Sequence, residues 1–221
     1  MALLSADSFN RANGAVGSTD GAGSLDPLAW TANAGTWAIS SNQLNASVLG
    51  AGPSVAVITC NLATANVDLS LTHGPNDVNG WGIVCRFSDM SNYVYLLGSS
   101  TTMLQLTKVV AGSSSAISGS FNVVNVGDVL RLVAVGNSFF VYHNGVLQGS
   151  SPYTDSFNNT ATKHGIAHQG TSQLSDAWSV NSAGITTVTG SQATETDTAT
   201  SGTLFAVRAG VIQFIPAVTT A

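Results

Sequence analysis

Charged residues are scarce in this sequence. Asp, Glu, Lys and Arg make up only 8% of its 221 residues, against about 25% in a typical soluble domain. Six Lys and Arg residues and eleven Asp and Glu residues leave a formal net charge of −5. Nucleic acids and anionic membrane surfaces are bound by clustered basic residues, and the sequence contains no such cluster. We therefore expect no nucleic-acid partner.

Long apolar runs and cysteines are also few. No stretch approaches the roughly 18 apolar residues that a membrane span needs, so no membrane insertion is expected. The opening "MALLSADSFNRANG" has no basic segment and only a short apolar run, which predicts synthesis without a signal peptide. Cys60 and Cys85 are too few for a disulfide framework. Free, buried thiols and a single disulfide both stay open, and we favour the thiols.

Carboxylates in pairs are missing as well. Glycosidases use two Asp or Glu residues that flank the scissile bond. The only glutamate is Glu195, near the C-terminus, and no two carboxylates stand two or four apart within a predicted strand. No nucleophile elbow and no phosphate-binding loop occurs. The sequence therefore predicts a protein that is not an enzyme.

Short alternating runs between Gly, Asn, Ser and Asp fill the first 182 residues. Such runs predict many strands and almost no helix. Val67, Leu69 and Leu71 alternate with polar residues on one strand. The predicted strands lie at 35–47 (two strands), 54–60, 66–74, 80–88, 92–99, 103–110, 127–136, 139–148 (a hairpin), 163–170 and 175–182. With no room for parallel crossovers, these runs predict an antiparallel β-sandwich.

Two details of this pattern are specific enough to test. Asn144-Gly145 separates two alternating runs, which predicts a type I′ turn with positive φ at both residues. In "GWGIVCRFS", strict alternation places Trp81, Ile83, Cys85 and Phe87 on one face.

Four motifs in order carry a resemblance. They are "DSFNRANG" with "GTWAISSNQL", then "GWGIVCRFSDMSNYVYLL", then "LRLVAVGNSFFVYHNGVL", and finally "DAWSV". Together they resemble the concanavalin A-like, laminin-G-like jelly rolls and cover about residues 5–182. The resemblance implies an all-β, antiparallel jelly-roll domain over residues 1–182, followed by a β-rich C-terminal appendage at 183–221.

The appendage differs in composition from the preceding domain. Its "ATETDTA" (193–199) is similar to a stretch in short β modules of bacteriophage tail and other virion proteins. The resemblance implies a virion surface protein that is made in the bacterial cytoplasm. Its partners would be other capsid or tail subunits, and it would form a homo-oligomer. Apolar residues around Ala209-Gly210 predict a hairpin that contacts a neighbouring subunit through Leu204, Phe205, Val207, Val211, Ile212, Phe214 and Ile215.

Candidate ligand sites are few. Tyr93 and Tyr95 are expected to form an exposed pair that could stack on a sugar, with Asp89 beside them, because Val94 and Leu96 supply the apolar face of that strand. Laminin-G-like domains hold calcium at the sandwich rim, which makes Asp7 and Asp176 weak calcium candidates; otherwise no cofactor or metal is expected. His164 and His168 have a metal-like spacing but lack a third ligand, so we expect surface or interface histidines.

The sequence therefore favours a non-enzymatic bacteriophage virion structural protein, either a capsid decoration or a minor tail protein. It would act in particle assembly or stabilisation and possibly in host-surface contact. The alternative is a carbohydrate-binding module that recognises a cell-surface glycan.

Overall fold

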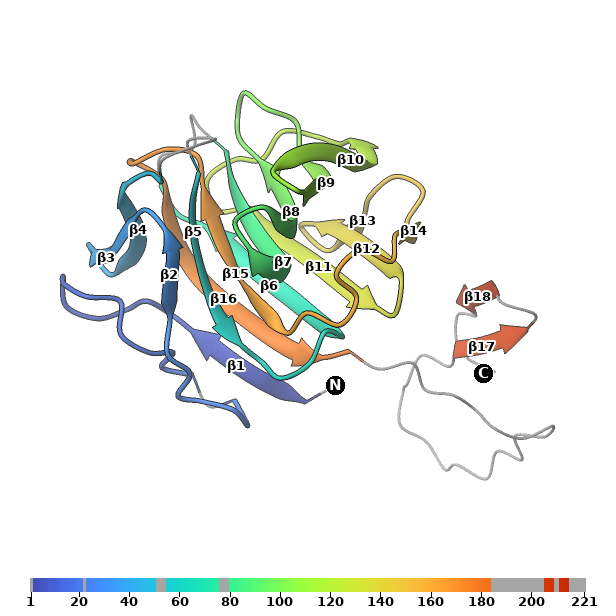
Figure 1. Cartoon of the computed structure of the whole chain (residues 1–221), viewed down its shortest axis with the longest axis horizontal. Helices are drawn as coiled ribbons and strands as arrows, with labels where there is room; N and C mark the ends of the chain where they lie inside the picture. Colours follow the sequence, from blue (N-terminus) through green and yellow to red (C-terminus); the bar gives the residue numbers. More distant parts are fainter. Residues whose placement is uncertain are drawn as a thin grey trace, which may run out of the picture. The chain divides into compact units, whose positions relative to one another are not determined.

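The computed structural model describes residues 2–21, 23–50, 55–75 and 80–183, and the backbone of 205–208 and 211–214. The chain divides into two compact units, Met1–Ile185 and Thr186–Ala221. Among the described residues every regular element is a strand, and no helix there could cross a membrane. The first unit is an antiparallel jelly-roll sandwich of two sheets (Figure 1), as the alternation predicts.

One sheet has nine strands in the order β13-β12-β11-β6-β16-β4-β3, with β1 paired to β16 and β14 paired to β12. It contains β1 (Leu3–Asp7), β3 (Thr36–Ser40), β4 (Gln43–Val48), β6 (Val67–His73), β11 (Val129–Val135), β12 (Ser138–His143), β13 (Val146–Leu147), β14 (Tyr153–Thr154) and β16 (Leu174–Ser182). The first and last strands of the domain therefore pair with each other, which closes the sandwich.

The second sheet has seven strands in the order β10-β9-β8-β7-β15-β5-β2. It contains β2 (Thr31–Ala34), β5 (Ala56–Asn61), β7 (Trp81–Asp89), β8 (Asn92–Gly98), β9 (Gln105–Val110), β10 (Ser113–Ser120) and β15 (Lys163–His168). Each predicted strand appears within a few residues of its expected position. β10 is a strand that apolar alternation does not predict.

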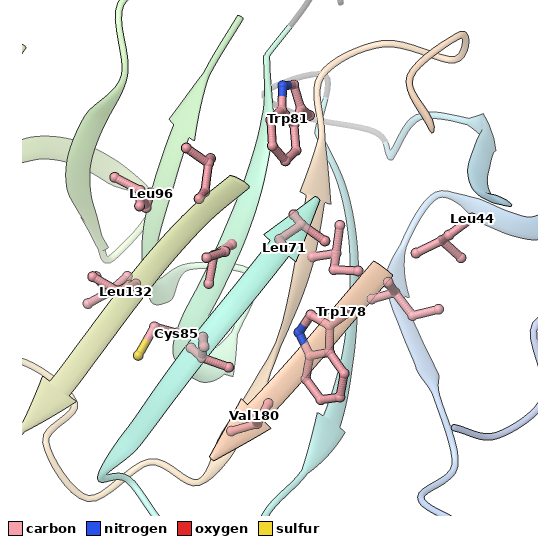
Figure 2. Close-up of a cluster of buried hydrophobic side chains, with 14 of the residues drawn as sticks. Leu44, Leu71, Trp81, Cys85, Leu96, Leu132, Trp178 and Val180 are labelled. Carbon is pink, nitrogen blue, oxygen red and sulfur yellow. The ribbon is translucent and has the colours of Figure 1, made fainter. Parts of the chain in front are cut away.

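The core lies between the two sheets. Figure 2 shows Leu71 and Trp178 from the nine-stranded sheet in one buried cluster with Trp81 and Cys85 from the seven-stranded sheet. All four side chains are buried. Every alternate residue of β6 contributes, as its sequence predicts. Burial at about 25 cal/mol per Å² of apolar surface is the main force that holds the sheets together.

Tight turns join consecutive strands. Asn144 and Gly145 have φ of 49° and 77°, which confirms the type I′ turn between β12 and β13. Ala111 and Gly112 show the same positive pair, at 49° and 81°, between β9 and β10. The second turn stands next to the turn between β7 and β8, to which Gly112 N is hydrogen-bonded.

The N-terminal Asp-x-Phe-x-Arg stretch, residues 7–11, forms a hydrogen-bond network around Asp7. Both carboxylate oxygens of Asp7 accept hydrogen bonds from Arg11, at 2.7 and 3.0 Å, and Oδ2 also accepts from Trp30 Nε1 at 2.7 Å. Asp7 is buried, and its burial, opposed by the Arg11 and Trp30 contacts, raises the pKa of the carboxyl. Trp30 in turn contacts Trp178, with ring centroids 4.9 Å apart. The stretch therefore ties the entry of the chain to the core.

The end of β7 departs from the predicted alternation. Trp81, Ile83 and Cys85 face the core as expected, but Phe87 does not. The register between β7 and β8 shifts between Cys85 and Asp89, and Arg86 has a φ of 53°. This bulge adds a residue to the strand and reverses the direction of the side chains that follow. Phe87 consequently lies on the outer face of the sheet.

The structure corrects the expectation for His164 and His168 and decides between the two alternatives for the cysteines. His164 and His168 are fully buried on the core face of β15, on either side of Ile166, and are not surface histidines. Strand alternation puts all three on one face, and the other face of β15 is the outer one. Burial lowers the pKa of His164 to about 4 and that of His168 to about 3, so both are neutral. Cys60 and Cys85 are free, buried thiols.

In the second unit β17 (Phe205–Arg208) pairs antiparallel with β18 (Val211–Phe214). The hairpin expected around Ala209-Gly210 is confirmed as a strand pair. Of the residues expected to make assembly contacts, Phe205, Val207, Val211, Ile212 and Phe214 lie on these strands, whereas Leu204 and Ile215 lie outside the described residues. The virion-like stretch 193–199 also lies outside them.

Candidate functional site

A groove lies on the outer face of the seven-stranded sheet. Its volume is about 480 Å³, within the range of about 300–1,000 Å³ for ligand pockets. The lining residues come from β2, β8, β9, β10 and β15 and from the segments at the strand ends. They are Asn33, Ala34, Gly35, Gly50, Val55, Met90, Ser91, Tyr93, Tyr95, Leu97, Val109, Gly112, Ser114, Ala167 and Gln169.

The floor of the groove is made of small and apolar residues. Gly82 lies between Ala167 of β15 and Leu97 of β8 in the sheet register. A Cβ at Gly82 would stand 1.9 Å from the carbonyl oxygen of Leu96, so no side chain fits there. Gly82 is itself buried, and the floor on either side of it is formed by Ala167 and Leu97.

Tyr93 and Tyr95 form the aromatic wall. Their rings are 5.7 Å apart and inclined at 38°, and the ring of Phe87 lies 5.8 Å from that of Tyr93. Tyr93 is only 2% exposed, whereas Tyr95 is half-buried. Burial, with a smaller effect of Tyr95, raises the pKa of Tyr93 to about 12. Phe87 and Tyr93 therefore support Tyr95, which presents the accessible ring.

Two turns form the polar wall at one end of the groove. Gly112 N donates to Ser91 O at 3.0 Å, which joins the β9–β10 turn to the β7–β8 turn. Asn92 strengthens this link: its Oδ1 accepts from Ala111 N at 3.2 Å. The same side chain donates through Nδ2 to both carboxylate oxygens of Asp89, at 3.0 and 3.1 Å. The hydroxyl of Ser91 is thereby carried on a braced turn, and that of Ser114 stands at the start of β10, just after the second turn.

The opposite end carries amides. Asn33 Nδ2 donates to Thr59 Oγ1 at 2.9 Å and to Thr31 O at 3.1 Å, which fixes the side chain and leaves its Oδ1 available to a ligand donor. Gln169 is anchored through its backbone, whose N donates to Gly80 O at 2.6 Å. Hydroxyls at one end, amides at the other and an aromatic ring between them can hydrogen-bond and stack at the same time.

Of the three predicted glycan-binding residues, the two tyrosines line the groove and Asp89 does not. Tyr93 and Tyr95 share the groove, but the expectation that both are exposed is wrong for Tyr93, because the bulge brings Phe87 against it. Asp89 is exposed outside the lining, where its carboxylate holds the turn through Ser91 N and Asn92. Asp89 therefore lies outside the described lining and braces the turn that carries Ser91.

The two calcium candidates differ in their surroundings, and calcium binding by them stays a prediction. Asp7 is occupied by Arg11 and Trp30, and Asp176 is exposed on β16. No group of three His, Cys, Asp or Glu side chains that could hold a metal occurs among the described residues.

Sequence reasoning did not find Asn33, Ser91, Ser114 and Gln169. These polar residues come from four segments far apart in the chain. Asn, Ser and Gln are common throughout the sequence, so nothing local marked these four.

Solved structures share this fold. The carbohydrate-binding module CBM66 from Bacillus subtilis is 16% identical, with a TM-score of 0.51 over 67% of this chain and 91% of the module. Domain 4 of AbnA, an extracellular arabinanase from Geobacillus stearothermophilus solved with arabinotriose, is 16% identical, with a TM-score of 0.52 over 82% of this chain and 93% of that domain.

A third match is the GH43 protein BlXynB from Bacillus licheniformis, as its K247S mutant. It is 14% identical with a TM-score of 0.53, and the match covers 80% of this chain and 39% of that protein. No protein-family model and no curated protein matches the sequence. At these identities the likenesses establish the fold, a concanavalin-like β-sandwich.

Proposed function

We propose that this chain is a non-catalytic carbohydrate-binding domain and that the groove over β8 and β15 is its glycan site. The observation that carries the proposal is the arrangement of Tyr95 between two sets of hydrogen-bonding groups. Sugars offer an apolar ring face and a rim of hydroxyls. A half-buried tyrosine ring suits the first, and the serine hydroxyls and amide groups suit the second.

The comparisons support this proposal at the level of the fold. A carbohydrate-binding module and an arabinanase domain solved with arabinotriose share the sandwich. The use of the groove is argued from its own residues, because a fold does not define a function by itself.

The chemistry of the groove favours binding without catalysis. Glycoside hydrolysis needs an acid and a nucleophile or base, both supplied by carboxylates about 5–10 Å apart. None of the described lining residues is Asp or Glu. The single glutamate, Glu195, belongs to the second unit and lies outside the described residues.

The virion role expected from the sequence receives no support from the matched structures, which are carbohydrate-binding and glycan-hydrolase domains. It rests on the stretch 193–199 and stays a prediction. A glycan-binding domain could also belong to a virion, so the two roles are compatible.

The test is glycan binding by wild type and by Tyr95 variants. On a glycan that the wild type binds, Tyr95→Ala should weaken affinity at least about tenfold, since removing a central aromatic costs a kcal/mol or more. Tyr95→Phe keeps the ring and should retain most of the affinity.

The matched control is Tyr142→Ala. Tyr142 lies on β12 of the other sheet, with the Arg131 guanidinium carbon 4.7 Å from its ring centroid, and does not line the groove. Calorimetry measures the affinities, and melting temperatures verify folding. Equal losses in the Tyr95→Ala and Tyr142→Ala variants, or no loss in either, would place any binding site elsewhere.

A further inference from the structure

We infer that the groove selects uncharged glycans and discriminates against chains that carry uronic-acid, sialic-acid, sulfate or phosphate groups. The inference rests on the proposed carbohydrate-binding function and names the ligand class for the same site. It follows from where the charges of this molecule lie.

The described lining of the groove contains no Asp, Glu, Lys, Arg or His. Its only ionisable side chains are Tyr93 and Tyr95, and Tyr93 stays neutral because burial raises its pKa to about 12. An anionic sugar that leaves water for such a site would lose hydration without gaining an opposite charge. Burying an unpaired charge is among the most costly events in protein recognition.

Most of the described cationic side chains are engaged outside the groove lining. Of six Lys and Arg residues, three form ion pairs: Arg11 with Asp7, Lys108 with Asp155, and Arg131 with Asp68, each at 2.6–2.7 Å. Arg86 is buried beside Phe139, where its Nη2 donates to Gly136 O at 2.7 Å. Arg208 belongs to the second unit.

Lys163 is the remaining cation, and it is exposed. It lines a separate, smaller hollow of about 200 Å³ together with Leu28, Thr59 and Asn61. Carboxylate and sulfate groups are recognised by Arg or Lys at hydrogen-bond distance. The groove of Tyr95 has no such residue in its described lining.

The charged residue closest in sequence to Ser91 of the polar wall is Asp89, which is negative. Asp89 is exposed in the turn that carries Met90 and Ser91. A carboxylate at the rim repels an anionic ligand, and the net charge of −5 adds to this repulsion at low ionic strength. The wall itself offers hydroxyl and amide groups, which match sugar hydroxyls.

The experiment compares matched pairs on a glycan array, followed by calorimetry. Neutral galacto-, xylo-, gluco- and arabino-oligosaccharides are paired with galacturonate, sialylated and sulfated counterparts. We expect at least tenfold tighter binding of the neutral member and an affinity that changes less than twofold between 50 and 500 mM NaCl.

Ser114→Lys provides the gain-of-function arm. It puts a cation at the polar wall and should raise affinity for the acidic counterparts at least tenfold. Ser120→Lys, on the same strand but outside the groove lining, is the control and should leave selectivity unchanged.

The outcomes separate the two proposals. Equal or tighter binding of acidic glycans by the wild type overturns the selectivity and leaves the carbohydrate-binding function standing. Binding of neither class overturns both. If Ser120→Lys alters the selectivity for neutral glycans as strongly as Ser114→Lys does, the selectivity arises from net charge. That result would refute the role of the groove.

Discussion

Mild acid should destabilise the jelly roll through two histidines that its core keeps neutral. In His164 the ring donates from Nε2 to Thr64 O at 2.9 Å and accepts at Nδ1 from Arg86 N at 3.3 Å. A second proton on Nδ1 would face that N–H and break the contact. His168 is equally buried. Its ring centroid lies 4.8 Å from that of Trp37, and its Nε2 lies 2.9 Å from Ser175 Oγ.

The sign and size follow from linkage between protonation and folding. The unfolded chain protonates each histidine near pH 6.5, whereas burial holds the folded pKa at about 4 for His164 and about 3 for His168. Below pH 6.5 the unfolded state therefore binds protons that the folded state does not. Between pH 7 and pH 5 this lowers the free energy of unfolding by about 2 kcal/mol for each histidine, or about 4 kcal/mol for both.

Carboxylates contribute little in this window. Hydrogen bonds outweigh burial and keep the pKa values of Asp20, Asp26 and Asp128 below their ordinary value, so these groups titrate at lower pH. Asp7 acts in the opposite sense, because burial raises its pKa and the folded state takes up that proton first as pH falls. The uptake of a proton by folded Asp7 therefore partly offsets the histidine effect as the pH falls.

The assay is urea unfolding followed by tryptophan fluorescence at pH 7, 6 and 5. Wild type should lose about 4 kcal/mol across this range, and His164→Asn, whose amide does not titrate, should lose only about 2 kcal/mol whatever its absolute stability. A flat profile for wild type, or an unchanged slope in the variant, would refute the buried neutral histidines.

Three further predictions concern the turn, the second unit and metal. Gly145→Val should lower the free energy of unfolding by about 1 kcal/mol or more, because a β-branched residue is strained at a φ of 77°. The control is Gly119→Val, where an added Cβ meets no neighbour within 4 Å and φ is not positive. Equal melting temperatures for the two variants would contradict this prediction. A chain ending at residue 183 should melt cooperatively and keep the glycan affinity of the full chain, since residues 1–185 form a compact unit with both sheets complete; a broad, non-cooperative melt would show that the second unit completes the core. EDTA should leave glycan binding unchanged, because the described groove lining contains no carboxylate; loss that calcium restores would show a metal requirement.

The strand pattern could be predicted from the sequence because alternation and turn chemistry are local. Val67, Leu69 and Leu71 face the core as their spacing indicates, and Asn144-Gly145 turns as its residue types require. β10 could not be predicted this way. Its sequence, Ser113–Ser120, has almost no apolar residues, and it is a strand because β9 offers it hydrogen-bond partners.

The candidate site could be predicted only in part. Alternation against Val94 and Leu96 correctly placed Tyr93 and Tyr95 on the outer face, but their burial depends on Phe87, which a bulge moves across the sheet. Bulges arise from pairing with a neighbouring strand, so strict alternation along one strand cannot reveal them. The polar wall depends on the contact between two turns separated by about twenty residues, which no local pattern encodes.

Gly82, which pairs with the lining residues Ala167 and Leu97, should tolerate substitution less well than the polar residues of the groove do. A side chain at this position would collide with the Leu96 carbonyl, at 1.9 Å from its Cβ, so the sheet beneath the groove requires glycine there. The hydroxyls and amides stand on turns and strand ends, where substitution leaves the ladder intact. Randomising Ser91, Ser114 and Gln169 should thus yield folded proteins with new ligand preferences, whereas variation at Gly82 should yield mostly unfolded ones. In a binder library, the polar rim of the groove is free to diversify and Gly82 is not.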